Sequence, residues 1–213
     1  MDLTDACVFP YPLGDSSLRR LAGEAGRLGF TSIVAIGEGP CKAGTVQVIR
    51  GELIQEGSVR ELLWAIKKVP KEAGQVLVNA GDNAFNRTAI TQRKTSILRH
   101  IYKTDPGAFD HVTARLAADR DVAIDLDIRP LIFQRGVMRQ NVIRRYAEIV
   151  KLHRRFGFPL TLSSHALSVL EQRSVREITG LCSLFDMTET EVYRALGTVG
   201  RIAGENSPVR VVA

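Results

Sequence analysis

Cysteine, histidine and long apolar runs are scarce in this chain of 213 residues. Its three cysteines, Cys7, Cys41 and Cys182, lie far apart with no C-x-x-C pair, which argues against a disulfide framework and a zinc site. No apolar run approaches the roughly 18 residues that a membrane-spanning helix needs. The N-terminus carries acidic residues where a signal peptide would carry basic ones. We therefore expect a soluble, cytoplasmic protein with reduced thiols and no membrane partner.

Motifs for phosphate binding and for nucleophilic catalysis are also missing. The stretch GEGPCKAG, residues 37–44, fits neither the dinucleotide-binding pattern G-x-G-x-x-G nor the P-loop pattern. Ser163 and Ser164 precede His165, but neighbouring strand residues point to opposite faces and do not make a catalytic triad. The sequence therefore predicts no catalytic residue from these motifs.

The chain does show a regular alternation of strand-like apolar runs and helical patterns. The capping-box pattern of a helix start, with glutamate three residues after serine or threonine, occurs at Ser58, Ser174 and Thr188. Strands separated by helices imply crossover connections and a parallel sheet. No linker or repeat interrupts the series, so we expect one domain over residues 1–213. The predicted strands are residues 6–9, 31–37, 44–54, 74–80, 96–101, 122–128 and 159–164.

The stretch DVAIDLDIRPLIF, residues 121–133, favours a barrel over an open sheet. Its apolar residues alternate with Asp125, Asp127 and Arg129, so one face of the predicted strand is charged. A strand in an open parallel sheet is apolar on both faces. The interior of a barrel, in contrast, becomes polar near the carboxyl ends of its strands, where barrel enzymes place their sites. We therefore predict an α/β fold, a TIM-like (β/α) barrel of about seven parallel strands.

These strand ends allow two interpretations, a metal centre or a structural charge network. Ligands for a mixed nitrogen and oxygen metal site are available at Asp5, His100, Asp125, Asp127 and His165. The first predicted strand, however, lacks the closely spaced histidines that would anchor a metal. We prefer the alternative, in which Asp125 or Asp127 pairs with Arg129 or another arginine and His165 hydrogen-bonds a loop.

The positive charge of the chain is concentrated in residues 135–155. This segment holds seven basic residues and one acid, Glu148, and accounts for the whole net charge of +6. Met138, Val142, Ile149 and Phe156 follow a helical spacing, and the basic residues fall largely outside that apolar stripe. An outer helix with an arginine-rich face suits the phosphate backbone of a nucleic acid. A merely solvated face is the plainer alternative.

Two motifs of the chain resemble those of the ribonuclease P protein component 3 family. VAIDLDIRPLI, residues 122–132, is similar to the family pattern V-A-I-E-x-x-x-R-P-L-L. TLSSHALSVLEQRSVREITGL, residues 161–181, is similar to a serine-containing turn followed by R-S-P-R-D-L. The upstream stretches NRTAI and FDHVTARLAADRDVAID also look like this family. The chain departs from the family pattern at Asp125, His165, Val175 and Glu177.

The resemblance implies a barrel of archaeal type, related to the PHP metal-dependent phosphoesterases but without their metal-binding histidine pairs. It also implies a subunit of ribonuclease P, the ribonucleoprotein that removes the 5′ leader from precursor tRNA. The RNA subunit then performs the cleavage with bound magnesium, so we expect no catalytic residue, metal or cofactor on this chain. The implied partners are the ribonuclease P RNA, a small protein subunit of the same particle and precursor tRNA.

These predictions give the charged residues two roles. Asp125, Asp127 and Arg129 would form a structural network left from a former active site. The competing hypotheses are a metal-dependent phosphoesterase of PHP type acting alone, and a scaffold whose basic helix binds an acidic protein. RNA phosphates are predicted to contact Arg135, Arg139, Arg144, Arg145, Lys151, Arg154 and Arg155, then Arg173 and Arg176 beside a helix N-terminus, and as second-rank candidates Arg87, Arg99, His111 and Arg115.

Overall fold

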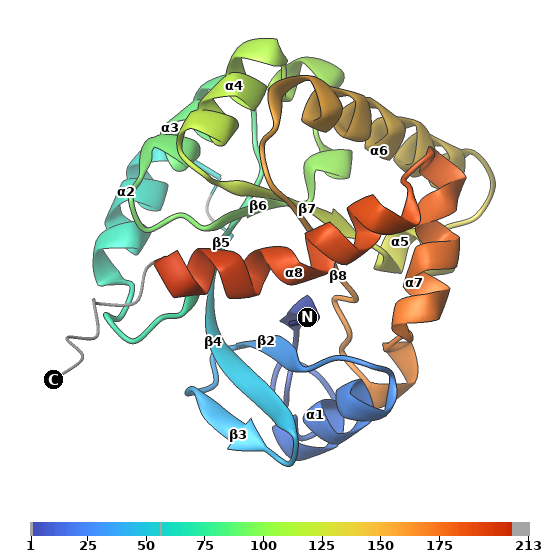
Figure 1. Cartoon of the computed structure of the whole chain (residues 1–213). Coiled ribbons are helices and arrows are strands. Elements are labelled where there is room, and N and C mark those ends of the chain that lie inside the picture. The colour runs from blue at the N-terminus through green and yellow to red at the C-terminus, as the bar shows by residue number, and fades with distance from the viewer. Residues whose placement is uncertain (1, 56, 206–213) are drawn as a thin grey trace, which may run out of the picture.

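The computed structural model describes residues 2–55 and 57–205, which fold around a barrel of parallel strands (Figure 1). Within these residues seven strands follow the order β1-β2-β4-β5-β6-β7-β8, and all neighbours are parallel. The predicted TIM-like barrel of about seven parallel strands is confirmed. The strands are β1 (Thr4–Val8), β2 (Ser32–Ile36), β4 (Val46–Ile54), β5 (Gln75–Asn79), β6 (Ile97–Arg99), β7 (Ala123–Asp127) and β8 (Leu160–Ser163).

All seven strands differ from their predicted bounds by one or two residues at one or both ends, and for two of them the cause is local. The run predicted over residues 44–54 is β4, and a short additional strand, β3 (Cys41–Ala43), pairs with it in antiparallel orientation. Gly44 makes the turn between them with φ of 66°, a conformation that glycine adopts without steric cost. β6 ends at Arg99 instead of residue 101, because His100 leaves the strand with φ of 60° and a short 3-10 turn follows.

Helices cover the outside of the barrel, and the predicted capping signals mark three of their starts. The Ser174 and Thr188 hydroxyls each accept from the backbone N–H of the glutamate three residues on, whose carboxylate accepts the capping residue's N–H in return. The Ser58 hydroxyl accepts from Glu61 N–H in the same way. Among the described helices, none is long and apolar enough to cross a membrane. The helices are α1 (Leu18–Arg27), α2 (Val59–Lys68), α3 (Asn83–Thr91), α4 (His111–Asp119), α5 (Arg129–Phe133), α6 (Gly136–Phe156), α7 (Val175–Cys182) and α8 (Glu189–Glu205).

The last helix, α8, closes the amino end of the barrel. In Figure 1 it crosses in front of the strands, and its Arg201 forms an ion pair of 2.8 Å with Asp121, just before β7 begins. Val199 and Ile202 of α8 pack into the barrel interior. The interior at this end is therefore apolar, and the residues that contribute to it are Ala6, Val34, Leu77, Ile97 and Ala123.

At the opposite end, β1 and the segment after β8 close the barrel through backbone hydrogen bonds. The N–H of His165 donates to the carbonyl of Cys7 at 3.0 Å, and the N–H of Phe9 donates to the carbonyl of Ala166 at 2.9 Å. An isolated parallel bridge also pairs Val8 with Ala166. The barrel is thus closed at its carboxyl end by the residues that surround His165.

Gly51 of β4 provides a test of the tight packing inside the barrel. A Cβ atom at this position would lie 2.7 Å from Cγ1 of Val34 and 2.8 Å from Cδ1 of Ile36. We expect Gly51→Ala to lower the free energy of unfolding, measured in urea, by roughly 1–3 kcal/mol because both buried side chains must shift. Gly23→Ala in α1 is the control, since a Cβ atom at this position would meet nothing within 4 Å. This substitution should stabilise the helix by about 0.5–1 kcal/mol. Equal effects of the two substitutions would contradict an inward-facing Gly51.

Candidate functional site

Three neighbouring strands change from apolar to polar inward-facing residues at the same height of the barrel. Along β5, β6 and β7, side chains alternate between the helices and the interior. The sheet register aligns Leu77 with Ile97 and Asn79 with Arg99. The polar residues therefore form one layer nearer the carboxyl ends, where barrels place their sites. The inward-facing residue changes from Leu77 to Asn79 along β5, from Ile97 to Arg99 along β6 and from Ala123 to Asp125 along β7.

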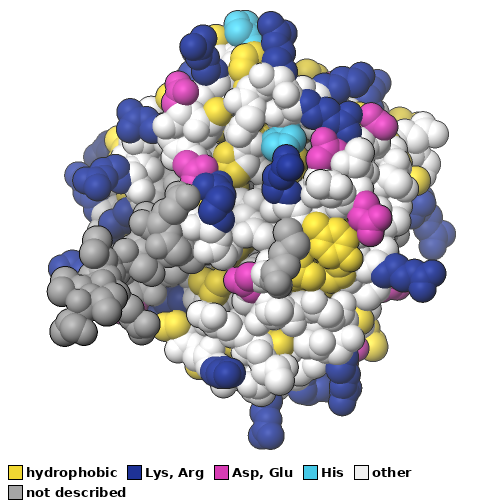
Figure 2. Space-filling model, viewed as in Figure 1, with side chains coloured by type: hydrophobic (Ala, Val, Ile, Leu, Met, Phe, Trp, Pro, Cys, Tyr) yellow, Lys and Arg dark blue, Asp and Glu magenta, His cyan; other side chains and the backbone are white. Residues whose placement is uncertain are grey.

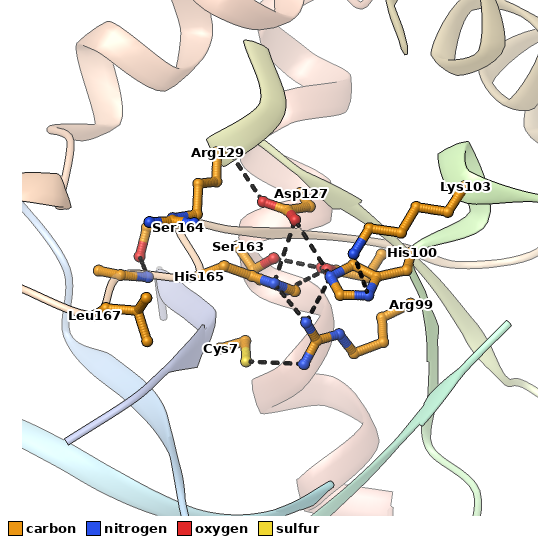
Figure 3. Close-up of polar contacts among 12 residues, drawn as sticks. Cys7, Arg99, His100, Lys103, Asp127, Arg129, Ser163, Ser164, His165 and Leu167 are labelled. Carbon is orange, nitrogen blue, oxygen red and sulfur yellow. Dashed lines mark hydrogen bonds and ion pairs between the residues drawn. The ribbon is translucent and has the colours of Figure 1, made fainter. Parts of the chain in front are cut away.

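Arg99 lies in the middle of this layer, and only 3% of its surface is exposed (Figure 3). Its terminal nitrogen Nη2 lies 2.6 Å from Nε2 of His100 and 2.8 Å from Nδ1 of His165. The other terminal nitrogen, Nη1, lies 4.0 Å from Sγ of Cys7. A guanidinium group remains protonated in proteins, so this side chain places a permanent positive charge inside the barrel.

Asp125 provides the matching negative charge. Its two carboxylate oxygens accept hydrogen bonds from the hydroxyls of Thr161 and Ser163 at 2.9 and 2.6 Å, and one of them lies 3.1 Å from Nε2 of His165. Burial alone would raise the pKa of Asp125, but the hydrogen bonds from His165 and Ser163 and the charge of Arg99 outweigh burial and lower it. Asp125 is therefore ionised inside the barrel.

The two histidines in the layer are neutral at pH 7. Burial, followed by the charges of Arg99 and Lys103, lowers the pKa of His100 to about 3. Burial also lowers the pKa of His165, against the opposing influence of Asp127 and Asp125. Because the carboxylate of Asp125 accepts from Nε2–H of His165, the Nδ1 atom presents its lone pair to Arg99.

Of the predicted network, the structure places Asp125 and Asp127 in the interior but not Arg129. Oδ2 of Asp127 lies 3.2 Å from Nδ1 of His165, and burial raises the pKa of Asp127. The guanidinium of Arg129 instead pairs with Glu171 at 2.9 Å, and only its backbone N–H reaches Asp127, at 2.8 Å. The strand ends at Asp127 because Ile128 has helical backbone angles and α5 begins at Arg129, with Pro130 in its first turn. The cation inside the barrel is Arg99.

Asp5 is buried but does not belong to this group. It accepts hydrogen bonds from the backbone N–H of Ser164 at 2.9 Å and from the Ser164 hydroxyl, and thereby adds a side-chain link between β1 and the end of β8. Burial raises the pKa of Asp5 to about 7, although the bonds from Ser164 oppose this rise. The carboxyl group therefore helps to close the barrel instead of facing Arg99.

A pocket of about 240 Å³ leads from the surface to the polar layer. Phe9, Tyr102 and Phe133 contribute aromatic walls, while Lys103 and Arg129 contribute positive charge. Lys103 Nζ lies 3.4 Å from Nδ1 of His100 (Figure 3). The site is thus a small cationic pocket at the carboxyl end of the barrel, with its carboxylates underneath.

The residues of the pocket do not fit a metal ion in their present arrangement. Within the described residues, His100, Asp127 and His165 are the one group whose ligand atoms all lie within 4.8 Å of one another. Nε2 of His100 and Nδ1 of His165, however, both face Nη2 of Arg99. A guanidinium and a divalent cation cannot share that position. Arg99 was predicted as an RNA contact, and the step from Ile97 to Arg99 along one strand was the signal that its side chain points inward.

α6 carries the basic segment along the outside of the barrel. Val142 and Ile149 are buried, as the helical spacing predicted, but Met138 is 62% exposed because the first turn of α6 does not pack on the barrel. Arg144, Lys151 and Arg155 are exposed. Spacings of seven and four residues bring these three to one face of the helix.

Three predicted RNA contacts are buried or already paired with acids of the protein. Arg99 lies in the barrel interior, and Arg145 is 7% exposed and binds an acid of its own helix at 3.0 Å. Arg154 lies between Asp186 and Glu191, at 3.0 and 2.7 Å. Since their guanidinium groups already have partners or are buried, these three residues are removed from the predicted interface.

Three further candidates are partly engaged. Arg87 pairs with Asp110 at 2.9 Å, and Arg139 and Arg173 donate to backbone carbonyls. Figure 2 shows Lys and Arg side chains around the whole outline of the viewed face, not over α6 alone. The candidates that are exposed and form no ion pair with a described residue are Arg135, Arg144, Lys151 and Arg155 with Arg176, His111 and Arg115.

Comparison with known proteins identifies the family. The family described as RNase P subunit p30 matches residues 2–207. The chain belongs to the RNase P subunit p30 family. Ribonuclease P protein component 3 of Methanothermobacter thermautotrophicus is 32% identical over 200 residues, which cover 85% of this chain and 80% of that protein. The protein of the same name from Methanosarcina barkeri is 29% identical over 214 residues, which cover 96% and 90%. The resemblance inferred from the motifs is confirmed.

Solved structures share the fold of this p30 family member. A chain in the cryo-EM structure of archaeal ribonuclease P with mature tRNA has a TM-score of 0.76 at 17% identity, covering 98% of this chain and 96% of that one. Histidinol phosphate phosphatase of Lactococcus lactis, solved with zinc, L-histidinol and phosphate, has a TM-score of 0.57 at 12% identity, covering 86% and 92%. The barrel is thus common to a ribonuclease P component and a zinc-containing phosphatase.

The raised pKa of Asp5 predicts a specific pH dependence. The stability contributed by its protonated form is complete below about pH 3.8 and is lost as the pH rises through about 7. Asp5→Asn keeps one acceptor oxygen for the Ser164 N–H, offers an NH2 donor to the Ser164 hydroxyl oxygen and removes this titration. Between pH 5 and pH 8, the free energy of unfolding of the variant should therefore gain roughly 2 to 3 kcal/mol relative to the original chain. Urea unfolding at several pH values measures the difference, and parallel pH curves would contradict the shifted pKa.

Proposed function

We propose that this member of the p30 family works in the cytoplasm as a protein subunit of ribonuclease P and supports the catalytic RNA by binding it through the outer face of α6. The family match over residues 2–207 carries the assignment to ribonuclease P. The relatives in Methanothermobacter thermautotrophicus and Methanosarcina barkeri are named as protein components of the same particle.

The exposed cations of α6 support the proposed role in RNA binding. Arg144, Lys151 and Arg155 lie along about 16 Å of one helix face. Glu148, on the same face, is already paired with Arg145, so its charge is partly neutralised. Contacts between such a stripe and phosphates are largely independent of base sequence and weaken as salt increases. This is the behaviour expected of a protein that stabilises a folded RNA.

A second exposed group extends the proposed surface onto α4, which packs beside α6. His111 and Arg115 are exposed and lie one helical turn apart on α4. Neither forms an ion pair with a described residue. We therefore place the RNA across α4 and α6, with Arg135 at the start of α6 and Arg176 on α7 as outlying contacts.

The competing function is a metal-dependent phosphoesterase that acts without RNA. The likeness in fold to histidinol phosphate phosphatase raises this alternative, and the position of Arg99 against both histidines opposes it. In the proposed role, the chemistry belongs to the RNA subunit with its magnesium, and this chain contributes no catalytic group. Hydrolysis of a phosphodiester by the purified chain alone, together with bound zinc or manganese, would favour the alternative.

Charge reversal on α6 tests the proposed RNA contacts. In a reconstituted particle with the ribonuclease P RNA, the triple variant Arg144→Glu, Lys151→Glu, Arg155→Glu should reduce cleavage of precursor tRNA at physiological salt. For binding of the chain to the RNA subunit, the slope of log K against log salt should become smaller by roughly two to three. Filter binding between 50 and 400 mM KCl measures the slope.

A matched triple variant on the other helices separates position from net charge. Arg19→Glu, Arg20→Glu and Lys67→Glu change the same number of exposed cations on α1 and α2. This control should leave the slope and the cleavage rate close to those of the original chain. Equal losses in both triple variants would show a general charge effect and contradict the assignment to α6.

We also propose that the small protein subunit of the particle binds at the junction of α5 and α6. Phe133, Val137 and Met138 are 52%, 68% and 62% exposed there, a cluster of large apolar side chains that is unusual on a protein surface. Substituting all three by serine should weaken binding of the small subunit at least tenfold in calorimetry. The melting temperature should stay within a few degrees, because these side chains contribute little to the core. Unchanged affinity would exclude this surface.

A further inference from the structure

His100, Asp127 and His165 are arranged as the ligands of a divalent cation. Oδ2 of Asp127 lies 3.2 Å from Nδ1 of His165 and 3.6 Å from Nε2 of His100. In a tetrahedral site with metal–ligand bonds of about 2.0–2.1 Å, neighbouring ligand atoms lie about 3.3 Å apart. Both distances from Oδ2 of Asp127 are therefore close to the spacing in a metal site, and the ligand atoms of all three residues lie within 4.8 Å of one another.

The surroundings hold two of these ligand atoms in a metal-binding orientation. The carboxylate of Asp125 accepts from Nε2–H of His165, which leaves Nδ1 free to bind a cation. The backbone N–H of Arg129 donates to Oδ1 of Asp127 and leaves Oδ2 directed inward. Metal-binding histidines and carboxylates commonly depend on such outer hydrogen bonds. The outer partners of a metal site are thus present on β7 and in α5.

Arg99 lies where the cation of such a site would lie. Its Nη2 atom is in hydrogen-bonding distance of both imidazole nitrogens, at 2.6 and 2.8 Å. The guanidinium also lies 5.6 Å from the centre of the Phe9 ring, which forms part of the pocket wall. In an ordinary buried ion pair the terminal nitrogens of arginine would bind carboxylate oxygens. Here the contacts of Nη2 are with two neutral nitrogen ligands.

We propose that the guanidinium of Arg99 replaces a divalent metal ion and that removing it opens a metal-binding site formed by His100, Asp127 and His165. The side chain supplies the positive charge that Asp125 and Asp127 require in the interior. It also excludes the ion sterically. Lys103, whose Nζ lies 3.4 Å from Nδ1 of His100, and Arg129 are further cations of the same pocket.

Metal titration of the full chain tests this proposal. Arg99→Ser removes both the bulk and the charge, and we expect it to bind one equivalent of Co²⁺ at least 100-fold more tightly than the original chain after treatment with a chelator. Calorimetry measures the affinity, and the visible absorption of bound Co²⁺ reports nitrogen ligands in a four- or five-coordinate site. Zn²⁺ should compete for the same site. The melting temperature of Arg99→Ser should rise with Co²⁺ and that of the original chain should not.

Two control variants identify the ligands. Arg99→Lys keeps a cation in the interior and should bind Co²⁺ no better than the original chain. The double variant Arg99→Ser, His165→Phe lacks one ligand and should lose the visible absorption and most of the affinity gained by Arg99→Ser. Equal binding by the double variant and by Arg99→Ser would place the metal elsewhere and overturn the proposal.

Other outcomes also decide the question. Tight binding of Co²⁺ by the original chain, abolished by His165→Phe, would show that Arg99 does not exclude the ion. A folded Arg99→Ser that binds no metal would show that the three ligand atoms do not form a site. If Arg99→Ser is unfolded without metal, Co²⁺ should restore its fold, and Arg99→Gln, which keeps more of the volume, should behave in the same way. Failure of Co²⁺ to fold either variant would contradict replacement of a metal by the guanidinium.

Discussion

The charge of Arg99 inside the barrel is the interaction on which the carboxyl end of this fold depends. Asp125 and Asp127 are both nearly inaccessible to water, and removing one partner of a buried charge group costs about 3–5 kcal/mol. His165 carries no charge of its own but connects the two sides, with Nε2 toward Asp125 and Nδ1 toward Arg99. The layer is therefore stable as a unit, and removing either Arg99 or Asp125 leaves the opposite charge without its partner.

The same group of residues also closes the barrel. The backbone N–H of His165 pairs with Cys7 of β1, while Asp5 holds the neighbouring Ser164. A loss of the polar layer would therefore disturb the join between β1 and β8, and an opening of that join would displace His165. This coupling gives the layer a structural reason to persist in a barrel for which we propose no catalytic group.

The sequence predicted the fold well because its signals are local. Alternation in residues 122–128 predicted the charged interior, and two serine–glutamate pairs and one threonine–glutamate pair predicted three helix starts. It failed where a side chain's direction depends on a neighbouring element. Arg129 was assigned to the charged face of the strand, but α5 begins at this residue and its guanidinium pairs with Glu171. Arg99 is the last residue of a strand of only three residues, so the single step from Ile97 was the one local signal of its inward direction.

Some of the basic residues that give the chain its net charge are not available to bind RNA phosphates. Residues 135–155 hold the whole net charge, yet Arg145 and Arg154 are already bound to acids of the protein. Such paired cations release no additional counterions when a phosphate approaches, so they add little to salt-dependent affinity. In the proposed role, the electrostatic attraction therefore comes from exposed cations without an ion pair on α4, α6 and α7. The proposed RNA surface thus extends over more than one helix.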